Sequence, residues 1–304
     1  MNIKQNYSTH PAIKPLTSFT WLMGFLLLAS PINAEVTLVA PGVISTGLGE
    51  HSPTLDVKRN ELVFMRRTPG RFDYTLYSSS YTKGQWSQPT VLPFSGTHRD
   101  GAPSFSADGQ TLLFDSRRPH PDLAPGSINL WQVNRTASSW GTPEPLLTLS
   151  QNQTNEKPAG LDEFGPLITP AGDIWFYAFR QPHRAGSHYR SQPGQAPQAM
   201  RQLPDPSADT FVGYLTLSND GRTAVIEGRS RSGRDGDLFY ACLKGDQWTT
   251  AEPLVAVNTS ANDGNPYLTA DMQWLWFASD RGEPSQGQSN LFRIHTKDLP
   301  IPCE

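Results

Sequence analysis

The chain has 304 residues, a formal net charge of −3 and two cysteines, Cys242 and Cys303. This mild acidity argues against a general nucleic-acid binder or a protein that binds anionic membranes. Two cysteines are too few for a disulfide framework or a complete zinc site. The length suits one large β domain.

Residues 1–34 are predicted to be a secretory signal peptide. Lys4 and Lys14 give a positive start, an apolar run follows over residues 19–29, and Ala34 offers a small residue for cleavage. A membrane-spanning helix needs roughly 20 apolar residues, so this run is short for an anchor. An uncleaved N-terminal anchor is the alternative. Cleavage would remove two lysines and no acid, so the net charge would change from −3 to −5.

Export would place the mature protein in the periplasm or outside the cell. That oxidising environment permits a disulfide between Cys242 and Cys303. Two independent thiols are the alternative. A bridge would tie the C-terminal tail to the fourth of the repeats described next.

Residues 35–304 repeat one phrase five times. Each copy has a strand that usually begins with proline, then a polar turn and a second apolar strand. The copies begin near residues 50, 100, 163, 210 and 262. Asp-Gly between alternating apolar runs, as at Asp108-Gly109 and Asp220-Gly221, is a strong hairpin signal. A period of about 50 residues indicates radial repetition of one small sheet.

The outer strands of each copy complete the prediction of the fold. A third apolar strand follows in every copy, and in three copies a fourth follows Trp86, Trp140 or Trp248. The fifth copy lacks a fourth strand, but the segment from Val36 (VTLVAPGVIST) resembles the one from Glu252 (EPLVAVNTS). We therefore predict an all-β, five-bladed β-propeller with four antiparallel strands per blade, in which the N-terminal strand closes the last blade.

The repeats resemble those of the TolB-type, WD-like β-propeller family. The shared phrase is Pro…Asp-Gly…Phe…Asp/Arg-Arg, and it is clearest in DGAPSFSADGQTLLFDSRR from Asp100 and NDGNPYLTADMQWLWFASDR from Asn262. The resemblance covers essentially all of residues 35–304. It implies an exported propeller, usually a binding platform, although some larger relatives are oligogalacturonate lyases. It implies the fold more strongly than the function.

Acidic and arginine side chains are expected on one face of the ring. The loop that leads into the first strand and the loop after the second strand lie on the same face of a blade, which we call the loop face. The turns between the two strands lie on the opposite, turn face. The acids that recur once per blade are Glu50, Asp100, Glu163, Asp209 and Asp263. The simplest interpretation is that they latch the blades by pairing with arginine.

A ligand site is predicted on the same face. The loops there add arginines and histidines beyond the repeated ones, which favours an anionic ligand. The candidate ligand-binding residues are Arg67, Arg117, Arg180, Arg229, Arg281, His51, His98, His120 and His183. An ordinary solvated loop surface is the alternative. The histidines lack the spacing of a metal site, so no metal or other cofactor is expected.

These patterns predict a non-catalytic binding or protein-interaction module. The partner would be a protein, an anionic small molecule or an oligosaccharide, and neither nucleic acid nor a membrane is expected. The protein is expected to be a monomer. The alternative is a carbohydrate-active lyase or hydrolase that uses the same face. No catalytic residue can be assigned, because the chain has no nucleophile elbow, phosphate loop or dinucleotide motif.

Overall fold

The protein is seen in a computed structural model. It describes residues 35–67, 70, 73–149, 161–180, 185–200, 210–230, 236–282 and 288–303. The predicted signal peptide and residues 150–160 lie outside these ranges. Only the backbone is described at Arg180 and at a few other strand ends.

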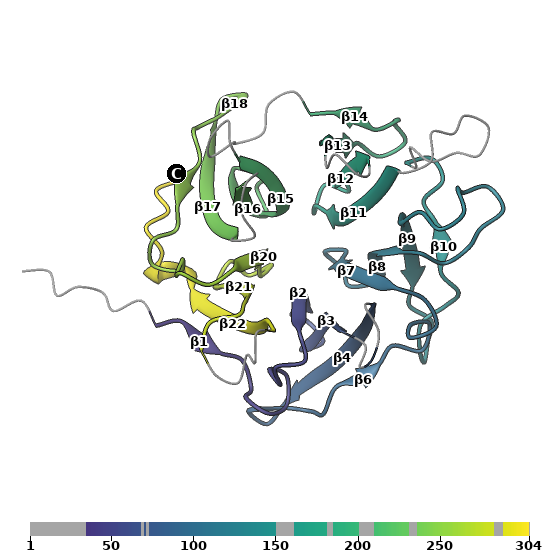
Figure 1. Cartoon of the computed structure of the whole chain (residues 1–304), viewed down its shortest axis with the longest axis horizontal. Coiled ribbons are helices and arrows are strands. Elements are labelled where there is room, and N and C mark those ends of the chain that lie inside the picture. The colour runs from purple at the N-terminus through teal and green to yellow at the C-terminus, as the bar shows by residue number, and fades with distance from the viewer. Residues whose placement is uncertain are drawn as a thin grey trace, which may run out of the picture. The chain divides into compact units, whose positions relative to one another are not determined.

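Five antiparallel sheets form a ring, as predicted (Figure 1). Blade 1 consists of β2 (Glu50–Asp56), β3 (Glu61–Arg67), β4 (Tyr74–Thr82), β5 (Gln85–Trp86) and β6 (Thr90–Val91). Blade 2 consists of β7 (Asp100–Phe105), β8 (Thr111–Ser116), β9 (Asn129–Asn134) and β10 (Glu144–Pro145). Blade 3 consists of β11 (Leu161–Ile168), β12 (Ile174–Arg180), β13 (Ala185–Ser191) and β14 (Gln198–Ala199).

Blade 4 consists of β15 (Thr210–Leu217), β16 (Thr223–Ser230), β17 (Gly236–Lys244), β18 (Gln247–Trp248) and β19 (Glu252–Pro253). Blade 5 consists of β20 (Asp263–Leu268), β21 (Trp274–Ser279), β22 (Asn290–His295) and, from the other end of the chain, β1 (Thr37–Leu38). A short 3-10 helix, η1 (Thr296–Asp298), follows β22. In blades 1 and 4 the outermost position is shared by two short strands, so these sheets have five strands instead of four.

The N-terminal strand closes the ring. β1 pairs with β22 in antiparallel register, with Thr37 opposite Arg293 and Leu38 opposite Phe292. This confirms the expectation from the sequence that the N-terminal strand completes the last blade. Closure covers an edge of blade 5 that would otherwise be open to pairing with another chain.

The second strand of each blade carries the core. Its most buried large side chain recurs once per blade, at Phe64, Phe114, Phe176, Ile226 and Phe277. The four phenylalanines belong to apolar clusters shared by neighbouring blades, whereas Ile226 packs within blade 4, which explains why the sequence repeats an aromatic or branched residue there. In blade 3 the β11–β12 turn is one residue shorter than the turns of the other blades. Counting along the chain with the length of the other turns would give Tyr177, but the residue at this position is Phe176.

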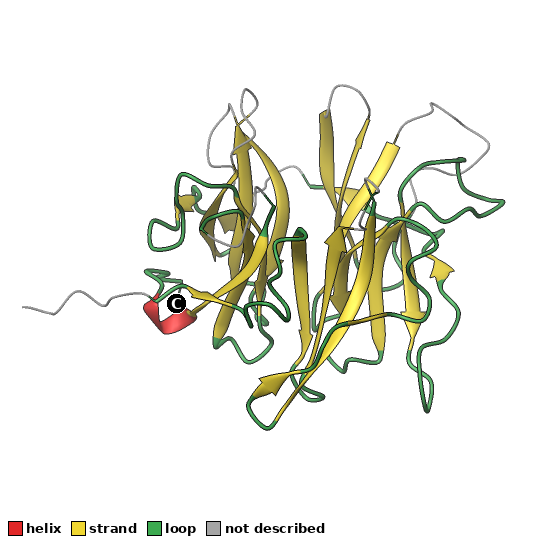
Figure 2. Ribbon diagram, turned by 60° about the horizontal axis from the view of Figure 1, so that its bottom comes forward, coloured by secondary structure: helices red, strands yellow, loops and turns green. Residues whose placement is uncertain are grey.

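The first strand of each blade lines the centre of the ring and carries a β-bulge. The bulged residues are Ser52-Pro53, Ala102-Pro103, Gly165-Pro166, Gly213-Tyr214 and Asn265-Pro266. All five pairs meet around a narrow central space of about 40 Å³. Figure 2 shows the strands running between the two faces of the ring. The bulges therefore mark the point where the first strands bend toward the loop face.

Cys242 and Cys303 form a disulfide, with their Cα atoms 5.2 Å apart. It joins β17 of blade 4 to the tail that follows η1. No helix in the described ranges is long and apolar enough to cross a membrane.

Candidate functional site

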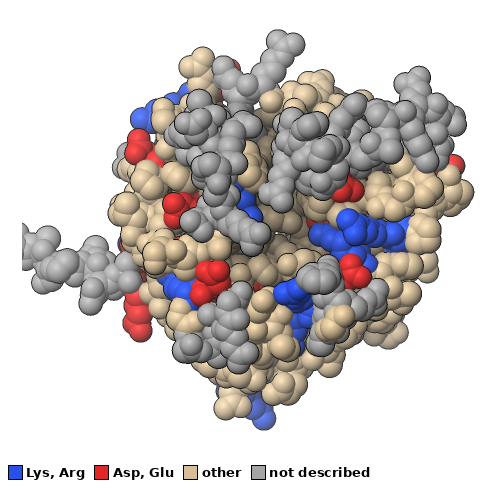
Figure 3. Space-filling model, in the orientation of Figure 1, with Lys and Arg blue, Asp and Glu red and all other residues tan. Residues whose placement is uncertain are grey.

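The loop face carries acidic and basic side chains next to one another. Figure 3 shows them around the central hollow of the ring. Several of these side chains form buried ion pairs: Arg66 Nε lies 2.9 Å from Glu50 Oε1, and Arg118 Nη2 lies 2.8 Å from Asp100 Oδ1. Arg281 pairs with Asp263 in the same way. Much of the charge on this face is therefore already neutralised within the protein.

Each of these ion pairs also holds the segment that arrives from the preceding blade. Arg66 Nη2 donates to Ile44 O at 3.0 Å, Arg118 Nη2 to Phe94 O at 3.1 Å, and Arg281 Nη2 to Val257 O at 2.6 Å. The carboxylates accept further hydrogen bonds from the same segments, for example from Ser95 Oγ to Asp100 Oδ2 at 2.7 Å. Such an arrangement is what a latch between blades requires.

Blades 3 and 4 depart from this pattern. Glu163 is fully buried in blade 3, and the side chain of Arg180 lies outside the described part of the structure. Asp209 is also outside it. In blade 4 the strand register places Val212, not an acid, at the position of Glu50 and Asp100.

The remaining candidate arginines differ in how they are held. Arg67 Nη1 donates to Gln288 Oε1 at 3.1 Å, and Arg229 Nε donates to Glu227 Oε1. Arg117 is exposed, and its guanidinium has no hydrogen bond to the other described residues. Arg281 is held by Asp263, whereas Arg67 and Arg229 both lie close enough to His51 for their charges to lower the pKa of that imidazole.

The candidate histidines come from different loops and strands and have different surroundings. His51 Nδ1 lies 3.3 Å from Asn265 Oδ1, and burial lowers the pKa of His51 to about 4. His98 and His120 are half-buried, and His120 Nδ1 accepts from the backbone N–H of Asp122 at 3.2 Å. His183 lies outside the described residues. Within the described ranges no three His, Cys, Asp or Glu side chains come together as metal ligands.

A cavity of about 250 Å³ lies between blades 3 and 4. Its aromatic walls come from both blades: Phe164, Trp175, Phe176 and Tyr177 from blade 3, and Phe211 and Tyr214 from blade 4. Three ionisable side chains also line it: His188, Glu227 and Arg229. Its position, between the start of β15 and the end of β16, places it at the loop face.

Glu227 and Arg229 form the polar wall of this cavity. Glu227 is fully buried; Oε1 accepts from Arg229, and Oε2 accepts from the backbone N–H of Asn265 in blade 5 at 2.8 Å. The carboxylate raises the pKa of Arg229, so this guanidinium keeps its positive charge. The two terminal nitrogens of Arg229 have no hydrogen-bond partner among the described residues, and 37% of its side chain is exposed.

His188 lies on the opposite wall. Its Nε2 is 3.0 Å from Gly213 O, so the imidazole of blade 3 donates a hydrogen bond to the backbone of blade 4. Burial lowers the pKa of His188 to about 4. At neutral pH the imidazole is uncharged, and the three ionisable groups of the cavity sum to zero charge.

Asp115 and Arg99 form a second buried ion pair, in blade 2, that is arranged like the Glu227–Arg229 pair of blade 4. Asp115 is fully buried, and its Oδ2 accepts from the backbone N–H of Gly165 in blade 3 at 3.2 Å. Burial alone would lower the pKa of Arg99, but the charge and hydrogen bond of Asp115, together with Tyr214 and Tyr74, raise that pKa overall. The residues beside the two carboxylates must be glycines for steric reasons. A Cβ on Gly264 would lie 2.7 Å from Glu227 Oε2, and one on Gly101 would lie 2.9 Å from Asp115 Oδ1.

Sequence reasoning missed Asp115, Glu227 and the aromatic walls. Strand pairing aligns one position of the second strands across the five blades, occupied by Met65, Asp115, Tyr177, Glu227 and Ala278. An acid inside a strand, at a place where other copies have apolar residues, is a signal that the sequence already contained.

No protein-family model and no curated protein matches the chain. Solved structures do. An endo-arabinase from Bacteroides thetaiotaomicron is 12% identical with a TM-score of 0.53, over 83% of this chain and 96% of that one. The catalytic domain of a GH62 α-L-arabinofuranosidase from Coprinopsis cinerea is 10% identical with a TM-score of 0.52, over 90% and 100%.

A TolB from Agrobacterium tumefaciens is 12% identical with a TM-score of 0.48, over 81% of this chain and 90% of that one. The two arabinan-related matches, with TM-scores above 0.5 and low identities, establish the fold and not the activity. The chain is a five-bladed β-propeller that is structurally similar to a TolB propeller and to propellers of carbohydrate-active enzymes.

Proposed function

We propose that this protein is an exported recognition module that binds one ring of a neutral saccharide in the cavity between blades 3 and 4. The observation that carries the proposal is the composition of that cavity. Six aromatic side chains surround one charge-balanced Glu227–Arg229 pair. Aromatic faces pack against apolar ring surfaces, and a few polar groups at one edge fix the orientation of a ligand.

The size of the cavity suits a small ligand. At about 250 Å³ it lies just below the range of roughly 300–1,000 Å³ that is usual for drug-sized ligands. One ring of a longer chain fits this description better than a folded protein surface. The open terminal nitrogens of Arg229 would donate to ring or hydroxyl oxygens.

Charge favours a neutral ligand over the anionic one suggested by the sequence. Arg229 is already neutralised by Glu227, and His188 is uncharged at neutral pH. Bringing a carboxylate into a cavity with no net positive charge leaves its desolvation cost uncompensated.

Recognition is favoured over hydrolysis by the number of carboxylates. Glycoside hydrolysis usually needs two carboxylates on either side of the bond that breaks. Among the described lining residues the cavity has one, Glu227, and both of its oxygens accept hydrogen bonds within the protein. Hydrolysis of arabinose-containing chains is the second candidate, because two solved propellers of similar fold carry the names of such enzymes.

Export rests on two observations. Residues 1–34 have the pattern of a signal peptide, and Cys242 and Cys303 form a disulfide of the kind that persists in oxidising compartments.

Calorimetric titration with three trisaccharides tests this function. We expect arabinotriose or xylotriose to bind, and trigalacturonate to bind at least tenfold more weakly. Phe211→Ala removes one wall of the cavity and should weaken binding about tenfold or more, whereas Tyr81→Ala removes an exposed aromatic ring far from it in blade 1. Arg229→Lys keeps the charge beside Glu227 but loses the guanidinium fork, so it should also weaken binding.

Two outcomes would overturn the proposal. One is that trigalacturonate binds most tightly. The other is that Phe211→Ala, shown to be folded by its thermal transition, binds as well as the wild type. Release of reducing sugar from arabino-oligosaccharides by the wild type would replace recognition with hydrolysis.

A further inference from the structure

At four of the five junctions, a side-chain hydrogen bond joins the first strands of neighbouring blades. Thr54 Oγ1 accepts from Phe105 N at 3.2 Å, which joins blade 1 to blade 2. Ser104 Oγ accepts from Ile168 N at 3.3 Å, which joins blade 2 to blade 3.

The same position works at two further junctions. Thr216 Oγ1 accepts from Leu268 N at 3.2 Å between blades 4 and 5. Between blades 5 and 1 the residue is Tyr267, whose hydroxyl donates to Leu55 O at 3.0 Å. One hydroxyl therefore spans each of these four junctions.

The junction between blades 3 and 4 lacks this bond. The strand register places Leu167 at the position of Thr54, Ser104, Thr216 and Tyr267. Leucine has no hydroxyl to offer to blade 4. This junction therefore lacks a hydrogen bond that the other four have.

Among the described residues, blade 4 has no such latch at the same junction. In blades 1, 2 and 5 an acid and an arginine hold the incoming segment of the preceding blade. In blade 4 the residues at the positions of Asp100 and Arg118 are Val212 and Ser230, so neither carries a charge.

The apolar packing follows the same pattern. At the other four junctions a buried apolar cluster has members from both blades, for example Val63 with Phe114 and Leu130 with Phe176. The cluster of blade 4 around Ile226 contains, among the described residues, members of blade 4 alone. The cavity occupies the place where the shared cluster would be.

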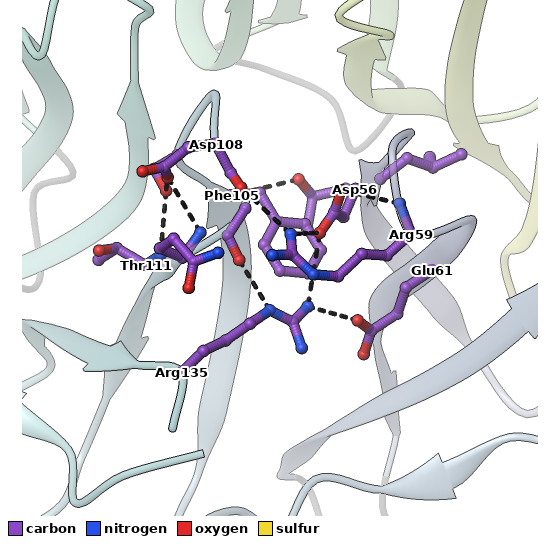
Figure 4. Close-up of polar contacts among 12 residues, drawn as sticks. Asp56, Arg59, Glu61, Phe105, Asp108, Thr111 and Arg135 are labelled. Carbon is purple, nitrogen blue, oxygen red and sulfur yellow. Dashed lines mark hydrogen bonds and ion pairs between the residues drawn. The ribbon is translucent and has the colours of Figure 1, made fainter. Parts of the chain in front are cut away.

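Other junctions have additional ties. Figure 4 shows the turn face between blades 1 and 2, where Arg135 reaches across to Glu61 and Asp56 and donates from Nε to Gly109 O at 2.7 Å. The Cys242–Cys303 disulfide links blade 4 to the tail of blade 5. Strand β1 closes blade 5 from the other end of the chain.

Two described contacts hold blades 3 and 4 together near the cavity. His188 of blade 3 donates to Gly213 O of blade 4. The Tyr214 ring of blade 4 packs so closely over Gly165 of blade 3 that a Cβ there would lie 2.9 Å from it. Both contacts border the cavity, so the site and the weak junction are the same place.

We propose that the ring opens between blades 3 and 4, and that the ligand of the cavity acts as a bridge that closes it. This proposal rests on the proposed function for its second half only. A ring of sugar between Trp175 of blade 3 and Phe211 of blade 4 would supply the apolar contact that the sequence omits. A ligand that binds only the closed form shifts the population toward that form.

Hydrogen exchange of the whole protein, read by mass spectrometry, tests both halves. Without ligand, the amides of β11 and β15 should exchange at least tenfold faster than those of the matched first strands β2, β7 and β20. With saturating arabinotriose, exchange should slow about tenfold in β11 and β15 and stay unchanged in β2 and β7. The matched strands serve as internal controls because each is the first strand of its blade and carries a β-bulge.

The outcomes separate the two proposals. Equal exchange in all five first strands of the unliganded protein would overturn the weak junction. Fast exchange in β11 and β15 that arabinotriose leaves unchanged, although calorimetry shows that it binds, would overturn the bridging role. If no trisaccharide binds, the proposed function and the bridge both fail, while the exchange of the unliganded protein still decides whether the ring opens there.

Discussion

His188 should make the ring sensitive to acid. Its imidazole is 5% exposed, and burial lowers its pKa from 6.5 to about 4 in the folded protein. In the unfolded chain the group takes up a proton near pH 6.5, whereas in the folded protein it stays neutral until about pH 4. The stabilisation that it provides is therefore complete above pH 6.5 and is lost as the pH falls toward 4.

The magnitude follows from the two pKa values. The difference between 6.5 and about 4, at about 1.4 kcal/mol for each pH unit, gives roughly 3 kcal/mol for the full loss. Most of this, about 2 kcal/mol, should be lost by pH 4.5. Because His188 spans blades 3 and 4, the loss falls on the junction that has the fewest other ties.

The assay is chemical unfolding of wild type and His188→Gln between pH 7 and 4.5. The amide nitrogen of glutamine reaches the position of Nε2, so this variant keeps a donor for Gly213 O without a titrating group. The other titrating groups cancel in the comparison. The free energy of unfolding of the wild type should fall by about 2 kcal/mol more than that of the variant.

If wild type and His188→Gln lose stability in parallel as the pH falls, the imidazole is not the buried neutral group described here.

Three further predictions concern stability and are checked by denaturant midpoints. Replacing Cys242 and Cys303 by serine opens a loop of 61 residues and should cost about 2–4 kcal/mol; an unchanged midpoint would mean that the bridge does not form. Asp100→Ala leaves the buried guanidinium of Arg118 without its carboxylate and should cost about 3 kcal/mol, against less than 1 kcal/mol if the pair is a solvated surface contact. The Leu167→Thr variant should be about 1 kcal/mol more stable than Leu167→Val, because threonine and valine have the same shape and only threonine offers a hydroxyl to blade 4. Equal midpoints would contradict the idea that a hydrogen bond is missing at this junction.

The fold could be predicted from the sequence because its determinants are repeated. Asp108-Gly109 and Asp220-Gly221 mark the hairpins, and the likeness of the segments from Val36 and Glu252 predicts the closing strand. These signals are local, and five copies of one local pattern agree with one another.

The cavity could not be predicted in the same way. It depends on how strands of two drifted copies align, and the acid expected at Asp209 corresponds in the register to Val212. This three-residue difference between the expected and the observed alignment changes which side chains face the junction. Phe211, Tyr214 and Glu227 contribute to the cavity through burial and neighbours from another blade, which no spacing along the chain reveals.

The central claim is that the ligand lies between blades 3 and 4, and a crystal structure of the protein grown with arabinotriose tests it most directly. The account predicts density for a sugar ring against Trp175 and Phe211, with Arg229 donating to one of its oxygens. A cavity of similar size, about 270 Å³, opens at the turn face and is lined by Leu55, Ser106 and Asp271. Density for the sugar in that cavity, or no density between blades 3 and 4, would contradict the claim.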